Sequence, residues 1–208
     1  MADAERVAAL PEEVIAAHGT VDGLLNVAGI IQPFVKFAEL DRAVMERVMD
    51  VNFWGVVNTT QAFLPHLLKR PAASVVNVSS MGGFLPVPGQ TVYGASKAAV
   101  KLLTEGLRAE TRGTPVTVTV VFPGAIGTNI TANSGVATPG RPAADSEAAK
   151  HQATSPADAA ETIVAAMEKG AYRVTIGKDA AFLDKFVRVA PEKAMEFIAK
   201  KMADLLKG

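Results

Sequence analysis

The stretch SVVNVSSMGGFLPVPGQTVYGASKAAVKLLTEGLRAE, residues 74–110, places two different hydrophobic patterns on either side of one loop. Its first part is a β-branched apolar run ending in Ser79 and Ser80, which predicts a buried strand over residues 73–80. Its last part is rich in alanine and leucine and predicts a helix over residues 91–112. A buried strand followed by a long helix is the unit from which parallel sheets are built.

The same alternation continues on both sides of this stretch. Near-continuous apolar runs bounded by glycine or proline predict further strands over residues 21–29, 114–124 and 172–177. Helical periodicity predicts helices over residues 2–19, 40–70 and 156–169 and in the tail, with a break at Pro191. We therefore expect an α/β fold of one domain over residues 1–208. Its core would be a doubly wound, mainly parallel sheet of about four strands, with helices on both faces.

Composition excludes several classes of function. Lys plus Arg and Asp plus Glu both number 21, so no charge excess points to nucleic acid or to an anionic membrane. The chain has no cysteine and its three histidines show no ligand spacing, so no metal site is expected. No apolar stretch is long enough to span a membrane, and no signal-peptide pattern is present, which predicts a cytoplasmic protein.

Tyr93 and Lys97 lie four positions apart in the predicted helix and therefore share one of its faces. Bringing a tyrosine pKa from about 10 to near 7 requires about 4 kcal/mol. An ammonium group about 5 Å away, at an effective dielectric near 20, contributes about 3 kcal/mol of this. A tyrosine tuned in this way can exchange a proton with an alcohol or a ketone at neutral pH. Taken alone, such a pair is more often one face of an amphipathic helix.

Neighbouring residues favour the catalytic interpretation. Ser80 ends a predicted strand, where its hydroxyl could hold a substrate oxygen, whereas Ser79 is interpreted as a strand-end hydrogen bond. Asn52 interrupts an apolar helix pattern at a cost in helix propensity, either as a catalytic amide or as an amide bonded to the backbone at a kink. The turn VFPGAIGT, residues 121–128, exposes backbone after another strand. These groups follow strands, and ligands of parallel sheets bind beyond the carboxyl ends of the strands.

The sequence resembles the short-chain dehydrogenase/reductase family in its single-domain form. The matching stretches are VDGLLNVAGI, VMDVNFWGVVNTTQAFLP, the segment 74–110 quoted above, and VTVTVVFPGAIGTNI. They match in order and spacing over roughly residues 3–130. The resemblance implies a partial Rossmann fold and assigns a catalytic role to Asn52, Ser80, Tyr93 and Lys97.

Each of these residues receives a distinct role from the resemblance. Tyr93 would be the general acid and base, while Lys97 would lower its pKa and hold the nicotinamide ribose. Ser80 would hydrogen bond the substrate oxygen, and Asn52 would anchor a water molecule in a proton relay to Lys97. The cofactor implied is NAD or NADP. The implied cofactor-binding residues are Asn26, Val27, Ala28, Gly29, Tyr93, Lys97, Pro123, Gly124, Ile126 and Thr128.

The sequence departs from the family pattern in two places. Val27 stands where the family motif Asn-Asn-Ala-Gly has its second asparagine, so one side-chain hydrogen bond is lost. No Gly-rich turn precedes residue 19, although family members bind the pyrophosphate with such a turn and select NAD or NADP close to it. We therefore expect a truncated member of the family that lacks the selecting residue and binds its cofactor weakly.

Two functions from different classes are consistent with the sequence. The first is an NAD(P)-dependent oxidoreductase that interconverts a secondary alcohol and a ketone. Its apolar segment MGGFLPVPGQ, residues 81–90, would form the wall of a site for a hydrophobic substrate, unless that segment is ordinary core packing. Residues 131–157, rich in small residues and proline, would be a flexible lid. The second is a cofactor-deficient remnant that serves as a dimerisation or interaction module. In either case, the family resemblance implies a homodimer or homotetramer formed through helices 40–70 and 91–112.

Overall fold

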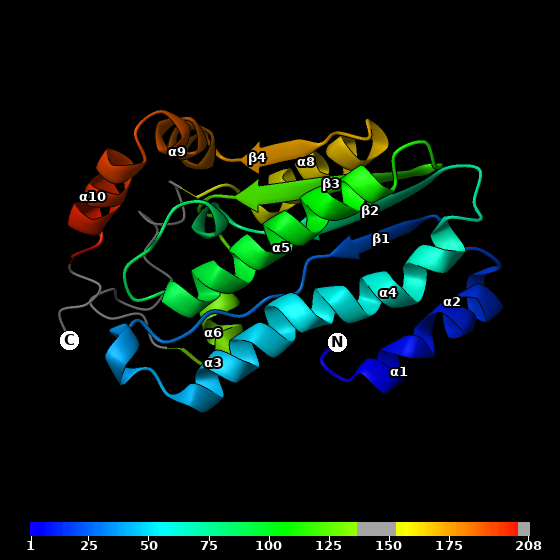
Figure 1. The fold of residues 1–208 in the computed structure, drawn as a ribbon, viewed down its shortest axis with the longest axis horizontal. Coiled ribbons are helices and arrows are strands. Elements are labelled where there is room, and N and C mark those ends of the chain that lie inside the picture. The colour runs from blue at the N-terminus through cyan, green and yellow to red at the C-terminus, as the bar shows by residue number, and fades with distance from the viewer. Residues whose placement is uncertain (137–152, 204–208) are drawn as a thin grey trace.

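The computed structural model describes residues 1–136 and 153–203 of the chain (Figure 1). The strands are β1 (Gly23–Asn26), β2 (Ala73–Val78), β3 (Val116–Pro123) and β4 (Arg173–Ile176). The helices of the first half are α1 (Ala4–Ala8), α2 (Leu10–His18), η1 (Phe37–Glu39), α3 (Arg42–Met49), η2 (Asp50–Trp54) and α4 (Gly55–Leu67). Those of the second half are η3 (Met81–Gly83), α5 (Thr91–Glu110), α6 (Ile130–Ser134), α8 (Pro156–Glu168), α9 (Lys178–Val189) and α10 (Pro191–Lys201).

The four strands form one parallel sheet in the order β1-β2-β3-β4. Its register sets Asn26 beside Asn77 and Val78 beside Val121, so the strands end near the same edge of the sheet. The predicted α/β fold with a mainly parallel sheet of about four strands is thereby confirmed. No helix in the described ranges is long and apolar enough to cross a membrane.

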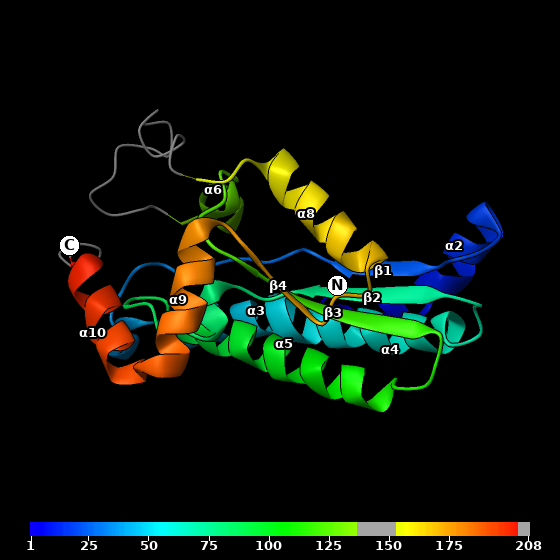
Figure 2. The same cartoon turned by 90° about the horizontal axis from the view of Figure 1, so that it is seen from above.

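Helices cover the two faces of the sheet (Figure 2). On one face, Phe63 and Leu67 of α4 pack against Val75 and Val118, and Leu107 of α5 joins the same cluster. On the other face, α8 packs its buried Ala159 and Ile163 against alternate residues of the strands, namely Val76, Val78, Val121 and Ile176. Successive strand residues point to opposite faces, which explains why β2 and β3 read as continuous apolar runs in the sequence.

Two predicted helices differ in detail from the structure. The helix predicted over residues 2–19 is divided into α1 and α2 at Ala9, because Pro11 belongs to the first turn of a new helix. The helix predicted over residues 40–70 runs from α3 to α4 through η2, a five-residue π-helix that contains Asn52. The lid predicted over residues 131–157 falls largely on residues 137–152, which lie outside the described residues.

The strand β1 forms an edge of the described sheet and leaves apolar side chains uncovered. Leu25 of the strand is 40% exposed, and Val27, the first residue after the strand, is 54% exposed. The helix α8 covers its face of the sheet mainly over β2, β3 and β4, and it reaches β1 through Met167, whose side chain lies beside Gly23 at the start of the strand. An exposed apolar edge of this kind is a surface on which further chain segments can pair.

Candidate active site

The predicted catalytic residues come from segments that follow the strands at one edge of the sheet and from the first turns of α5. Ser80 lies two residues after the end of β2, and Tyr93 lies in the first turn of α5 (Figure 1). A loop that packs closely joins them: a Cβ added at Gly82 would lie 3.4 Å from the Tyr93 ring atom Cε1 and 3.5 Å from Ser80 Oγ. The backbone at Gly82 therefore lies beside both the serine hydroxyl and the phenol ring.

Ser80 has two roles in the local structure. Its Oγ accepts a hydrogen bond of 3.0 Å from the Gly82 amide and so caps the short helix η3. A hydrogen bond between Ser80 and the Tyr93 side chain also lowers the tyrosine pKa. The preceding Ser79 is buried, and its hydroxyl donates to the Lys97 carbonyl at 2.7 Å. The interpretation of Ser79 as a strand-end hydrogen bond is confirmed.

Lys97 is almost fully buried, with 3% of its surface exposed. Its Nζ donates to the carbonyl of Val78 at 2.9 Å, which fixes the ammonium group at the end of β2. A Cβ added at Gly29 would lie only 3.1 Å from this Nζ, so the backbone after β1 passes directly beside it. Burial lowers the pKa of Lys97 from 10.5 to about 8.

The ionisation of Tyr93 differs from the sequence-based expectation. Burial raises the pKa of Tyr93 above its ordinary value of 10.0, and the hydrogen bond with Ser80 offsets only part of this effect. For the protein without a bound cofactor, the expectation that Lys97 lowers the pKa of Tyr93 toward neutrality is wrong. The physical reason is that helical spacing places the two side chains on one face but does not reveal how completely that face is desolvated. At neutral pH Tyr93 is therefore a protonated phenol, which is the form that donates a proton.

Asn52 is fully buried in the π-helical segment η2. Its Oδ1 accepts from the Ile30 amide at 2.8 Å, and its Nδ2 donates to the Ile30 carbonyl at 2.9 Å and to Ser96 Oγ at 3.0 Å. The amide thus joins the loop after β1 to the helix α5. These contacts match the interpretation of an amide bonded to the backbone at a kink. A role in a proton relay remains a prediction.

The side chain of Asn26 lies within the protein interior. Its Nδ2 donates to Asn77 Oδ1 at 2.8 Å, and its Oδ1 accepts from the Thr59 hydroxyl at 2.7 Å. Asn77 in turn donates to Thr104 Oγ1 at 3.0 Å, so a buried polar chain crosses from β1 to α5. The side chain of Asn26 is therefore occupied by bonds within the protein. Val27 and Ala28 are exposed and Gly29 is half-buried, and contact of residues 26–29 with a cofactor remains a prediction.

The turn after β3 is held by contacts from two other segments. The amide of Ala125 donates to the Asp179 carboxylate at 2.8 Å, and Thr154 pairs with the backbone on both sides of Ile126. A Cβ at Gly124 would overlap this carboxylate, which explains why glycine follows Pro123. The predicted cofactor residues of the turn, Pro123, Gly124, Ile126 and Thr128, therefore lie on a rigid support, with Thr128 exposed.

The apolar loop over residues 81–90 is mainly part of the core. Leu85 is 1% exposed and clusters with Leu183, Ala194 and Ile198 of the C-terminal helices α9 and α10. Met81 and Phe84 pack against the same cluster and remain half-buried. The alternative of ordinary core packing therefore describes most of this loop better than a substrate wall does.

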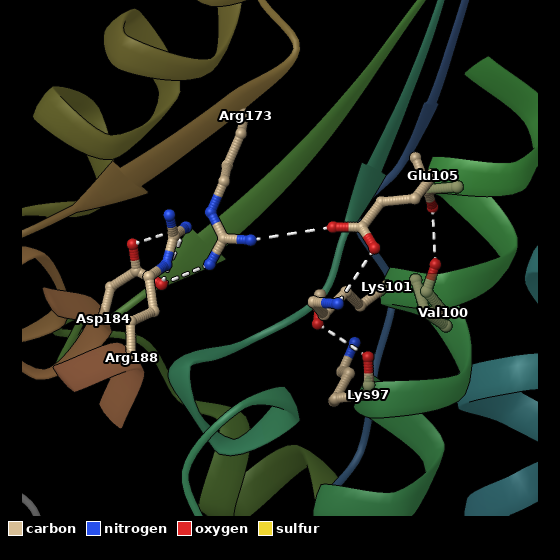
Figure 3. A network of polar contacts seen from close by, with 9 residues as sticks. Lys97, Val100, Lys101, Glu105, Arg173, Asp184 and Arg188 are labelled. Atoms are coloured by element: carbon tan, nitrogen blue, oxygen red, sulfur yellow. Dashed lines mark hydrogen bonds and ion pairs between the residues drawn. The ribbon is translucent and has the colours of Figure 1, made fainter. Parts of the chain in front are cut away.

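Two charged or polar positions near the site are not apparent from local spacing. Arg173 of β4 lies between the carboxylates of Glu105 on α5 and Asp184 on α9 (Figure 3). Gln32, in the loop after β1, is fully buried and reaches the first turn of α5. Both act across long sequence separations, so no spacing rule for helices or strands could identify them.

The buried lysine gives a stability prediction that requires no cofactor. Between pH 8 and 10.5 the unfolded chain keeps the Lys97 proton that the native protein releases, so the unfolding free energy rises with pH. We expect wild type to gain about 2 kcal/mol from pH 7 to pH 10 relative to Lys97→Met. Urea unfolding followed by circular dichroism measures both proteins. A difference between the two that does not change with pH would show that Lys97 titrates normally.

Comparison with known proteins agrees with this geometry. Residues 1–138 match the family described as short chain dehydrogenase. SadH of Mycobacterium tuberculosis is 38% identical over 213 residues, which cover 98% of this chain and 75% of SadH. The chain belongs to the short-chain dehydrogenase/reductase family. The resemblance based on the stretches around Tyr93 and Lys97 is thus confirmed, and with it the general class of oxidoreductases.

Solved structures of the family superpose on most of the chain. A short chain dehydrogenase of Burkholderia cenocepacia, in complex with NADP, has a TM-score of 0.77 and 26% identity, with 95% of this chain and 75% of that one covered. A short chain dehydrogenase/reductase of Burkholderia phymatum, in complex with NAD, has a TM-score of 0.75 and 25% identity, with 90% and 74% covered. The family therefore includes close structural matches with either dinucleotide.

The residues around Lys97 fit the nicotinamide end of such a cofactor. A lysine ammonium has three donors, and the structure gives Lys97 one hydrogen-bond partner among the described residues, the Val78 carbonyl. The remaining donors and the adjacent Gly29 backbone suit the hydroxyls of a ribose. In residues 1–136 and 153–203, however, no Gly-rich turn connects a strand to a helix N-terminus in the manner that binds pyrophosphate.

Proposed function

We propose that this protein is an NAD(P)-dependent oxidoreductase that interconverts a ketone and a secondary alcohol. The observation that supports this function best is the approach of Ser80 and Tyr93 to each other, with Lys97 one turn further along the same helix. Membership of the short-chain dehydrogenase/reductase family gives the reaction class. Burial keeps the Tyr93 phenol protonated at neutral pH, which is the form that reduction of a ketone requires.

The side chains divide the proton chemistry between them. The Ser80 hydroxyl donates a hydrogen bond to the substrate oxygen and orients it toward the Tyr93 hydroxyl. Tyr93 gives its proton to that oxygen during reduction and takes it back during oxidation. Lys97 would hold the ribose with its ammonium protons, and with a pKa of about 8 it stays mostly charged at neutral pH. The nicotinamide, when bound, supplies or accepts the hydride.

A hydrophobic substrate is the second part of the proposal. Most of the loop over residues 81–90 packs in the core, so the support comes from its half-buried members, Met81, Phe84 and Val87. Met81 follows Ser80 directly, and Phe84 and Val87 lie further along the same loop, so the parts of these side chains that remain accessible are the apolar surface that the proposal assigns to the substrate. Activity against ketones of increasing apolar size, at fixed cofactor concentration, should rise with size if this surface contacts the substrate.

Direct cofactor binding tests the proposed function. Trp54 is the single tryptophan of the chain and is 51% exposed in η2, so its emission can report on a nearby nicotinamide. We expect saturable energy transfer from Trp54 on titration with NADH or NADPH, and the variant Trp54→Phe to abolish the signal. A folded sample that binds neither cofactor at millimolar concentration would contradict the oxidoreductase and support a non-catalytic interaction module.

We also propose that the protein is cytoplasmic and that it assembles as a homodimer or homotetramer. The exposed face of α5 carries a row of small and apolar residues at helical spacing: Ala95, Ala98, Leu102, Gly106 and Ala109. Leu102 is 69% exposed, and α4 lies beside α5 on the same side of the sheet (Figure 1). Small residues allow two helices to approach closely across such a face. A mass of twice or four times 21.7 kDa in light scattering would support this assembly.

A further inference from the structure

Among the residues that the structure describes, Gln32 is the largest fully buried polar side chain that has no part in the proposed chemistry. It lies between β1 and η1, in the loop that carries Gly29, and its exposed fraction is 0%. A buried side-chain amide is costly unless its donors and acceptor are all paired. The contacts of Gln32 therefore indicate what this residue does for the site.

The hydrogen bonds of Gln32 converge on the start of α5. Its Oε1 accepts from the backbone amides of Val92 and Tyr93, at 2.9 and 3.0 Å. Its Nε2 donates to the Gly89 carbonyl at 2.9 Å, and its own carbonyl accepts from Gln90 Nε2 at 2.7 Å. The side chain thus binds both the loop before the helix and the helix itself.

The first turn of a helix has amides without partners inside the helix. They are usually paired by the side chain of the residue just before the helix. In the described structure the corresponding residue of α5, Gln90, makes no such capping bond. Gln32 provides the cap instead, from a loop that lies about 60 residues earlier in the chain. One of the two amides it binds belongs to Tyr93 itself.

The loop that carries Gln32 is in turn fixed on both sides. Asn52 binds the amide and the carbonyl of Ile30, and Ser134 of α6 accepts from the amide of Ile31 at 3.0 Å. The Gly29 backbone of this loop passes beside Lys97 Nζ. The loop after β1 therefore contacts Lys97 with one end and the amide of Tyr93 with the other.

We propose that Gln32 is a positioning residue that holds the first turn of α5, and with it Tyr93, against the loop after β1. The proposal rests on the proposed function in one respect only, namely that Tyr93 is the residue whose position matters for proton transfer. It predicts that loss of the Gln32 amide loosens residues 91–94 while the later turns of α5, which pack against β3, keep their structure.

The variant Gln32→Met tests this, because methionine has a similar length and no hydrogen-bonding amide. Hydrogen–deuterium exchange should be at least about 10-fold faster at Val92 and Tyr93, and unchanged from Val100 onward. In a Tyr172→Phe background Tyr93 is the single tyrosine, so ultraviolet titration reports its ionisation alone. Burial raises the pKa of Tyr93, so loosening should move its titration down toward 10.0. With a ketone substrate, kcat should fall while the KM for the cofactor stays the same.

Two further variants keep the proposal open to refutation. Gln90→Met removes only the bond to the Gln32 carbonyl, so Val92 and Tyr93 should stay protected. Gln32→Glu keeps acceptor oxygens for both amides, and it should retain their protection even if Gln32→Met does not fold. Wild-type exchange at both amides in Gln32→Met would overturn the proposal. So would exchange that accelerates equally along α5, or lost protection in Gln32→Glu.

These measurements separate the proposal from the proposed function. Exchange and tyrosine titration require neither cofactor nor substrate. If wild type reduces no ketone but exchange at Val92 and Tyr93 depends on Gln32, the oxidoreductase function fails and the positioning role stands. If wild type is active and Gln32→Met leaves exchange, tyrosine titration and kcat unchanged, the positioning role fails and the function stands.

Discussion

Replacement of Tyr93 by phenylalanine should lower ketone reduction by roughly 100- to 10,000-fold, the range that a positioned general acid contributes. The phenol is the only group in the proposed mechanism that can give a proton to the substrate oxygen. Phenylalanine keeps the ring that packs beside Gly82, so neither the fold nor the titration of Trp54 with cofactor should change. Turnover is measured from the nicotinamide absorbance with a panel of ketones.

Tyr172→Phe is the matched control. Tyr172 is 47% exposed and lies beneath the Arg108 guanidinium, 5.4 Å from its ring centroid, so its hydroxyl has no part in the mechanism. This variant should retain the wild-type rate. Because burial raises the pKa of Tyr93, kcat for reduction at saturating cofactor should keep its proton donor until the pH passes the ordinary tyrosine value of 10.0. The KM for the cofactor should rise earlier, above about pH 8, where Lys97 loses its charge. A Tyr93→Phe protein with more than a tenth of the wild-type rate would assign the proton to another group.

The sheet could be predicted from sequence because its strands are buried on both faces. The runs over residues 73–80 and 114–124 are apolar at successive positions and contain β2 and β3 almost completely. The break at Pro191 and the helix over residues 91–112 were equally clear, since proline position and helical periodicity are local properties. The division of the first helix at Ala9 was not expected, because periodicity alone does not locate such a break.

The candidate site shows the same division between local and long-range information. Tyr93 and Lys97 follow from spacing within one helix, and Ser80 follows from the end of a strand. The direction of the Tyr93 pKa shift was predicted wrongly, because desolvation depends on packing from segments that are distant in sequence. Gln32 was missed for a related reason, since a glutamine between apolar residues has no local feature that identifies the helix it caps.

Removal of the Arg173 guanidinium should cost about 3 kcal/mol of unfolding free energy, near the lower end of the range for a broken buried ion pair. Arg173 is paired with Asp184 and, at 3.6 Å, with Glu105, and its guanidinium lies 4.2 Å from the Phe122 ring centroid (Figure 3). The three charged side chains are between 14% and 18% exposed, so water screens them poorly. Arg173→Met keeps the aliphatic stem and removes the charge.

The lower end of the range is expected because neither carboxylate would be left without a cation. Glu105 keeps Lys101 at 2.9 Å, and Asp184 keeps Arg188 at 3.0 Å. Arg188 is 57% exposed, so Arg188→Met is the control and should cost less than about 1 kcal/mol. Urea unfolding of both variants gives the comparison. Equal costs would mean that burial adds nothing to this network, whereas a large cost for Arg173 alone would make it the residue that ties α5 to β4 and α9.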